Sequence, residues 1–301
     1  MTKDDRHRNV IKDGSHRKGA FTGRNQRRLP RFKDATLRSM TNLSDKTLHK
    51  KEEADNFLTT IADAYLFIVK VVRETFTREF EWKEFFKQCY LVGNKSLALV
   101  SVTGIIMGAV LTIQSRPVLD DFGAVSMLPG MVAISLVREM GPVITALIFA
   151  GKVGSGMGAE LGSMKVTEQI DAMEVSSTNP IRFLVVTRVL AATLILPLLV
   201  LFADAMGLFG SWAAANIKGK VTLTLFLSQA FSSLDFIDLM PAFIKTFFFG
   251  AVIGLVSTYK GYNAGRGTES VGAAANSAVV VSSLLVLVVD IIAVQITDMI
   301  S

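Results

Sequence analysis

Charged residues interrupt the long apolar stretches in the later part of this 301-residue chain. They are Arg138, Glu139, Asp204, Lys245 and Asp290. A charge at the centre of a bilayer costs about 2.5 to 3.5 kcal/mol on insertion scales, so such residues usually face a partner or a wet cavity. Pro142 offers no N–H to the carbonyl of Arg138, which predicts a kinked or loosened helix beside the charged pair. These residues indicate either a polar cavity or internal ion pairs, such as Arg138 with Asp290.

Other chemistry is disfavoured by the residues that the apolar part lacks. The three histidines are His7, His16 and His49, and Cys89 is the single cysteine. The apolar part therefore has no imidazole for a Ser-His triad or a zinc site, and an internal disulfide is excluded. A Walker A motif is also missing, because Val153 and Val221 follow the two Gly-Lys pairs. We expect no catalytic residue, no metal and no cofactor in this chain.

A glycine-rich run begins at Gly151, in which Gly154, Gly158 and Gly162 recur every four residues. A nucleotide-binding loop is one interpretation. However, no strand precedes the run, and Ala159 occupies the last glycine position of Gly-x-Gly-x-x-Gly. Small residues at four-residue spacing let helices approach closely. The run therefore predicts a helix-packing stripe.

Charge is concentrated near the N-terminus. Residues 1–90 contain 33 charged side chains, and residues 91–301 contain 25. Residues 1–56 are predicted to form a basic, disordered cytoplasmic tail that associates with anionic lipid. A nucleic-acid-binding arm is the alternative, but Phe21 and Phe32 are its only aromatic residues and no binding motif accompanies it. We expect no nucleic-acid partner. We also expect no secretory signal peptide, because the first apolar stretch comes only after residue 57.

Residues 57–95 have the pattern of amphipathic helices. Apolar residues from Leu58 to Val72 recur at three- and four-residue steps. A second stretch mixes aromatic residues such as Trp82 and Phe86 with lysines. Such a mixture directly before a membrane span is typical of helices in the membrane interface. A small soluble packing domain is the alternative.

Residues 96–301 are predicted to form an all-α membrane domain with five transmembrane helices. The apolar segments are about 97–115, 124–150, 183–215, 239–259 and 277–300. Each is long enough to cross about 30 Å of hydrocarbon. The third is longer than one span requires and contains Pro197, which predicts a kink or an extension beyond the bilayer. Residues 216–238, with Phe226 and Phe231, predict a short amphipathic element on the outer face.

Basic residues in the loops set the expected orientation. Six fall on the side of the N-terminus: Lys152, Lys165, Arg182, Arg188, Lys260 and Arg266. Three fall on the opposite side: Arg116, Lys218 and Lys220. The positive-inside rule then places the N-terminus in the cytoplasm and the C-terminus outside.

A cytoplasmic loop spans residues 164–179. A short helix is predicted within about residues 164–176. Thr167 is its expected N-cap, and Glu168, Gln169 and Asp171 suit the first turn after this cap. Ile170, Met173 and Val175 add an apolar edge. This helix has the character of a docking site for a soluble partner.

Several stretches resemble the MlaE-type (YrbE-like) permease family, the membrane subunits of ABC transporters that move phospholipids with MCE-domain proteins. They are Arg138-Glu-Met-Gly-Pro-Val-Ile-Thr-Ala-Leu-Ile, Ala159-Glu-Leu-Gly-Ser-Met-Lys-Val-Thr-Glu-Gln-Ile-Asp-Ala-Met-Glu174, Asn179-Pro-Ile-Arg-Phe-Leu-Val-Val, Lys260-Gly-Tyr-Asn-Ala and Val281-Ser-Ser-Leu-Leu-Val-Leu-Val-Val-Asp290. The likeness covers about residues 57–301. The basic tail is longer than the family requires, and Gly154-Ser-Gly-Met-Gly replaces a commonly alanine-rich run.

The resemblance implies an inner-membrane homodimer. Two ATPase subunits, which bind ATP and Mg²⁺, lie on its cytoplasmic side and an MCE-protein ring on its periplasmic side. The family's coupling helix matches Glu168, Gln169, Ile170, Asp171, Ala172, Met173 and Glu174. Its lipid cavity matches Gln114, Arg138, Glu139 and Lys245.

We accordingly expect Arg138 and Lys245 to bind the lipid phosphate and Gln114 to form a polar wall. Glu139, rotated by about 100° around the helix, is expected to point away from Arg138 and form a salt bridge across the dimer or a gate contact. An ion-coupled secondary transporter is the main alternative function, but five spans show no inverted repeat. An intramembrane protease is disfavoured because the spans lack histidine and a matching pair of aspartates.

Overall fold

The structure is a computed structural model that describes residues 59–76, 80–217, 219 and 221–300. Every regular element within these residues is a helix. Five of the helices are long and apolar enough to cross a membrane: Trp82–Asp121, Val125–Val166, Ile181–Asn216, Leu239–Tyr262 and Thr268–Met299. The predicted all-α fold with five spans is confirmed, and the chain is a multi-pass membrane protein. The tail predicted over residues 1–56 lies outside the described residues.

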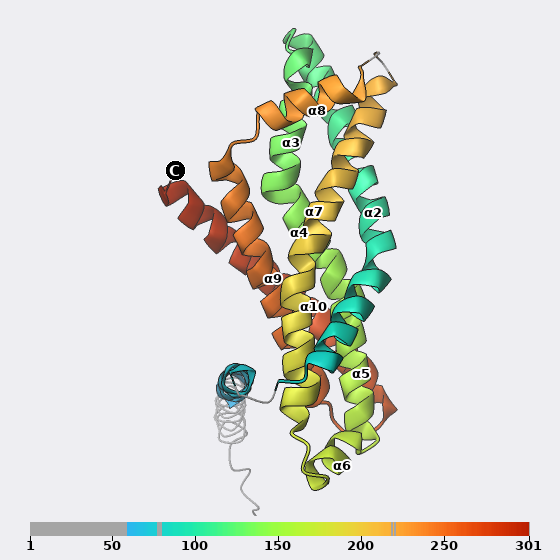
Figure 1. Cartoon of the computed structure of the whole chain (residues 1–301), viewed down its shortest axis with the longest axis vertical. Helices are drawn as coiled ribbons and strands as arrows, with labels where there is room; N and C mark the ends of the chain where they lie inside the picture. Colours follow the sequence, from blue (N-terminus) through green and yellow to red (C-terminus); the bar gives the residue numbers. More distant parts are fainter. Residues whose placement is uncertain (1–58, 77–79, 218, 220, 301) are drawn as a thin grey trace, which may run out of the picture. The chain divides into compact units, whose positions relative to one another are not determined.

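The elements follow one another in a simple order (Figure 1). After a helix over residues 59–75 they are α2 (Trp82–Asp121), η1 (Val125–Met127), α3 (Leu128–Ser135), η2 (Leu136–Met140), α4 (Gly141–Phe149), η3 (Ala150–Gly154), α5 (Ser155–Val166), α6 (Gln169–Val175), η4 (Ile181–Val186), α7 (Thr187–Asn216), α8 (Leu223–Ser232), α9 (Phe236–Tyr262) and α10 (Thr268–Ile300). In Figure 1, α6 and α8 lie at opposite ends of the bundle, which we call the α6 end and the α8 end.

The first and third spans pack through their backbones. A Cβ added to Gly104 of α2 would lie 2.6 Å from the carbonyl oxygen of Ala203 in α7. Gly108 of α2 approaches Gly207 of α7 in the same way, and a Cβ at Gly108 would overlap the Gly207 carbonyl. Lipid supplies no hydrophobic force between helices, so small residues that permit such close van der Waals contact hold the pair together.

The second span is not one uniform α-helix. A π-helical turn, η2, precedes Gly141 and Pro142, and a second π-helical turn, η3, follows α4. The loosening predicted at Pro142 is confirmed, because the wider turn ends at Met140, two residues before the proline that has no N–H. Pro197 does not have this effect in α7, because the α-helix continues through this buried residue.

The glycine stripe of α5 and η3 faces other helices. A Cβ at Gly154 would lie 2.8 Å from Ser257 Oγ in α9, and one at Gly158 would lie 3.2 Å from Ala278 Cβ in α10. At Gly162 the nearest atom would be Ala264 Cβ, at 3.4 Å. The three glycines therefore let α9 and α10 approach this part of the second span closely.

The amphipathic N-terminal region consists of one separate helix and the start of α2. In the helix over residues 59–75, Phe67 and Val71 are buried against Val185 and Val189 of η4 and α7. The aromatic stretch that begins at Trp82 instead forms the first turns of α2 and continues into the membrane span without a break. The predicted domain boundary at residue 95 therefore falls inside a helix.

Residues 216–238 contain the expected amphipathic element. In α8, Phe226 and Ala230 are buried, whereas Leu225 and Phe231 are exposed. Ala230 packs with Ala133, Leu136 and Leu208, so α8 closes the bundle over α3 and α7. Lys218 and Lys220 lie outside the described residues.

Candidate intramembrane polar site

Lys245 is the centre of an ion cluster inside the membrane domain. Its Nζ donates to Glu139 Oε2 at 2.7 Å and to Asp290 Oδ1 at 2.9 Å. The three residues come from α9, η2 and α10, and the lysine side chain is only 5% exposed. Two carboxylates thus compensate one buried ammonium, and no lipid phosphate is needed to make its burial tolerable.

Arg138 belongs to the same region but has a different partner. Its Nη2 lies 3.4 Å from Asp298 Oδ1 of α10, and the two side chains are 35% and 66% exposed. The pair of Arg138 with Asp290, our example of an internal ion pair as the alternative to a cavity, is wrong, because Asp290 binds Lys245. Asp298 was not predicted as a site residue. It lies eight residues after Asp290, about two helical turns. This spacing places both aspartates on a similar side of α10 and could have indicated Asp298 as a site residue.

The direction predicted for Glu139, away from Arg138, is wrong. The salt bridge across the dimer or gate contact that we also expected of Glu139 stays a prediction. In the structure Glu139 binds Lys245 of its own chain. It also lines, together with Arg138 and Lys245, one small cavity of about 10 Å³, which is at most the room for a single water. The π-helical turn changes the angle between neighbouring residues around the helix axis. The long side chains of Arg138 and Glu139 can therefore both reach this cavity.

Gln114 does not join this cluster. It lies exposed on α2 near the α8 end, two residues before Arg116, whose Nη1 donates to the Ala215 carbonyl at 2.7 Å. Gln114 is not among the residues that line the cavity of Arg138, Glu139 and Lys245. The structure thus brings together three of the four predicted lipid-site residues.

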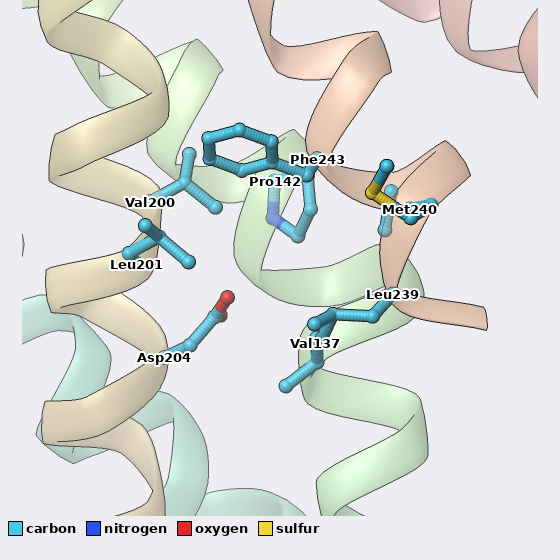
Figure 2. Close-up of a pocket in the computed structure, with 9 residues that line it drawn as sticks. Val137, Pro142, Val200, Leu201, Asp204, Leu239, Met240 and Phe243 are labelled. Atoms are coloured by element: carbon cyan, nitrogen blue, oxygen red, sulfur yellow. The ribbon is translucent and has the colours of Figure 1, made fainter. Parts of the chain in front are cut away.

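A third intramembrane acid, Asp204 of α7, faces a separate pocket of about 230 Å³ (Figure 2). Figure 2 shows its carboxyl group pointing from α7 towards the space between α7, the second span and α9. Six of the apolar residues that line the pocket are Val137, Pro142, Val200, Leu201, Leu239 and Phe243. The sequence marked Asp204 as a charge in an apolar segment but gave it no partner and no role.

Arg188 is a buried residue of α7 and not the loop charge that we predicted. Its side chain is 2% exposed, Nη2 lies 2.8 Å from Glu160 Oε1, and Nη1 donates to the Leu184 carbonyl at 2.9 Å. The hydropathy pattern placed Arg188 near the start of the third apolar segment. In the structure the helical region begins earlier, at Ile181, so Arg188 lies within it and is buried. Arg188 therefore drops out of the loop charges that set the orientation.

The short helix α6 protrudes at its end of the bundle. Ile170 is fully buried against Leu161 and Leu184, so this residue anchors α6 and is not available to a partner. Val175 is 88% exposed. The exposed residues of the predicted coupling segment are Glu168, Gln169, Asp171, Ala172 and Glu174, whereas Met173 is partly buried.

The predicted cap of α6 is wrong. Helix α6 begins at Gln169, and Glu168 precedes it in a left-handed conformation with φ of 59°. Thr167 instead ends α5, where its hydroxyl donates to the Ser163 carbonyl at 2.8 Å. Two interactions fix the short helix further. Lys165 Nζ forms an ion pair with Asp171 Oδ1 at 2.7 Å, and Tyr262 Oη donates a hydrogen bond to Glu174 Oε1 at 3.3 Å.

Five spans, a second span broken by π-helical turns and charges gathered inside the bundle define a polytopic helical membrane protein with a buried polar site. The chain belongs to the MlaE permease family: the family described as Permease MlaE matches residues 85–296. A probable ABC transporter permease protein of Rickettsia typhi is 41% identical over 202 residues, which cover 67% of this chain and 78% of that protein.

Two further relatives carry more specific names. The intermembrane phospholipid transport system permease protein MlaE of Haemophilus influenzae is 36% identical over 208 residues, 68% of this chain and 79% of that protein. The chloroplastic protein TRIGALACTOSYLDIACYLGLYCEROL 1 of Arabidopsis thaliana is 31% identical over 223 residues, 74% of this chain and 64% of that protein.

Proposed function

We propose that this chain is the permease subunit of an ABC transporter that moves phospholipids between the inner membrane and an MCE-protein channel. The observation that carries the proposal is membership of the MlaE family together with a relative named for phospholipid transport. The polar site supports it, because a lipid head group needs charged residues where the protein otherwise meets hydrocarbon. Neither the family nor its named relatives favour an ion-coupled secondary transporter.

Arg138 is the residue that we assign to the lipid phosphate. Its guanidinium can donate two parallel hydrogen bonds to phosphate, and its side chain is 35% exposed. Lys245 is less suited to this role in the described conformation, because Glu139 and Asp290 already neutralise it. We infer that Lys245 reaches a phosphate only if a conformational change releases one of these acids.

The energy source is a separate ATPase that docks at the α6 end, and the chain supplies no ATP site, Mg²⁺ or other cofactor of its own. The exposed residues of α6, above all Glu168 and Gln169, form the contact surface. The α6 end carries Lys165, Arg182 and Arg266, which supports a cytoplasmic location for this end by the positive-inside rule. The C-terminus then lies in the periplasm, where an MCE-protein ring meets the α8 end. The functional unit is a homodimer.

The proposal is tested by purification from native membranes in mild detergent, followed by mass spectrometry of bound proteins and lipids. An ATPase, an MCE-domain protein and phospholipid are the expected companions. In liposomes the complete complex should transfer fluorescent phospholipid only with ATP, and the isolated chain should hydrolyse none. Rapid ATP turnover by the isolated chain, or a complete complex that moves no phospholipid, would overturn the assignment.

A further inference from the structure

Asp204 is a buried acid whose partner is absent from the described part of the chain. The residue is 7% exposed, and its buried Oδ1 has no hydrogen-bond partner. Glu139 and Asp290, the other two acids of the membrane interior discussed above, both bind Lys245. An unpaired carboxylate in such surroundings costs several kcal/mol, so its charge calls for a cation or a proton.

The described residues around the pocket of Asp204 supply no side-chain donor for the carboxylate. Among the described residues that line its pocket, Asp204 is the only one with a polar side chain. Pro142 lies on the facing wall and has no N–H to give. Room for the carboxyl group depends on Gly141, because a Cβ there would overlap Asp204 Oδ1. The structure therefore accommodates the acid sterically without satisfying it.

The pocket adjoins the site of Arg138. Ala242 of α9 lines both the Asp204 pocket and the small cavity of Arg138, Glu139 and Lys245. Val137, which lines the Asp204 pocket, is the residue directly before Arg138. Arg138, which can bind an anion, thus follows in the π-helical turn η2 a residue that lines the pocket of Asp204, the α7 acid that can bind a cation. A zwitterionic head group carries a phosphate and an ammonium that are separated by a two-carbon link.

We propose that the Asp204 pocket binds the primary ammonium group of an amine-bearing phospholipid whose phosphate lies at Arg138. This inference rests on the proposed function and names its substrate class. A volume of about 230 Å³ corresponds to roughly eight waters of liquid volume, enough for an ethanolamine group. A primary ammonium donates three hydrogen bonds, as that of lysine does, whereas a trimethylammonium donates none. Phe243 is the one aromatic residue on the wall, so an aromatic cage for a quaternary ammonium is not formed by the described residues.

The first test needs no variant. The purified full chain is equilibrated in detergent with equal amounts of phosphatidylethanolamine, its mono- and dimethyl derivatives, phosphatidylcholine and phosphatidylglycerol, all with the same acyl chains, and bound lipid is quantified by native mass spectrometry. Binding should fall with each methyl group and be lowest, by at least about tenfold, for the lipids without an N–H. Equal occupancy by all five lipids would overturn the inference but leave the phospholipid function intact, whereas no bound phospholipid of any kind would contradict the function itself.

The second test assigns the preference to Asp204. Asp204→Asn should retain phosphatidylglycerol but lose most of the preference for phosphatidylethanolamine. The matched control is Asp121→Asn, at the exposed end of α2, which should keep the wild-type preference. An unchanged preference in Asp204→Asn would show that the ammonium binds elsewhere. Soluble ethanolamine at millimolar concentration should not displace the lipid, and displacement would indicate a site for small amines instead.

Discussion

The cluster at Lys245 and the pocket at Asp204 both place charged residues inside the membrane domain, but they differ in whether these residues are paired. In the cluster, three charged side chains from three helices bind one another and leave almost no empty volume. In the pocket, one carboxylate faces a larger, apolar space, and its Oδ1 has no hydrogen-bond partner among the residues that the structure describes. Charges inside this membrane domain therefore differ in their role. A charge whose partners come from the same chain stabilises the bundle, and a charge without such partners is the stronger candidate for a ligand.

The largest expected effect tests the cluster. Lys245→Met removes the shared cation and leaves the partly buried Asp290 and the 39% exposed Glu139 close together without compensation. We expect the free energy of unfolding to fall by about 3 kcal/mol, the lower end of the range for a broken buried pair because Glu139 reaches solvent, measured by unfolding in mixed micelles. The triple variant Lys245→Met, Glu139→Gln, Asp290→Asn should recover most of this loss, because it removes the uncompensated charges. Wild-type stability in Lys245→Met alone would refute the view that the cluster holds the helices together.

The second effect has the opposite sign. Asp204→Leu replaces the unpaired carboxylate with an apolar side chain of similar shape. We expect the free energy of unfolding to rise by about 1 to 3 kcal/mol, because an unsatisfied buried group is removed. The same micelle assay measures it, with Asp121→Leu on the surface as the control. A strong loss of stability would indicate that Asp204 has a structural partner and would remove the contrast between the two regions.

A smaller effect on stability is expected at Arg138. Its pair with Asp298 is largely solvent-accessible, and such pairs contribute about 0 to 1 kcal/mol. Arg138→Ala should therefore fold and dimerise but carry less co-purified or crosslinked phospholipid and transport less of it. Arg138→Lys, which keeps the charge and loses the bidentate geometry, should recover this only in part. A variant that fails to fold while its remaining population keeps normal lipid occupancy would assign Arg138 to the structure.

The smallest effect on stability is expected on α6, outside both regions. Glu168→Lys reverses a charge on an exposed residue that precedes the helix. Stability should change by less than about 0.5 kcal/mol, while co-purification of the ATPase weakens because rim charges govern association. Glu174→Lys is the companion variant, although it also loses the bond from Tyr262. Undiminished ATPase recovery with both single variants and the double variant would remove α6 from the interface.

The features that depend on neighbouring residues alone could be predicted from the amino-acid sequence. Hydropathy over about twenty residues predicts a membrane span wherever its neighbours lie, and the five spans are accordingly present. The break at Pro142 was equally local, because a missing N–H disturbs the helix in any surroundings. The family resemblance rested on contiguous motifs and was confirmed by the match over residues 85–296. The ends of the spans were less predictable, since α2 begins at Trp82, in the amphipathic sequence before the predicted 97–115 segment, and stays helical there.

The pairing of the charged residues could not be predicted in this way, because it depends on how the helices pack. Lys245 and Glu139 are 106 residues apart in the chain, and their contact depends on the rotation of α9 and on the π-helical turn at η2. The same dependence explains the wrong pairing of Arg138, the burial of Arg188 and the anchoring role of Ile170. The isolation of Asp204 is the extreme case. A sequence shows that a charge is present, whereas the absence of a partner becomes visible only when every helix around it has been placed.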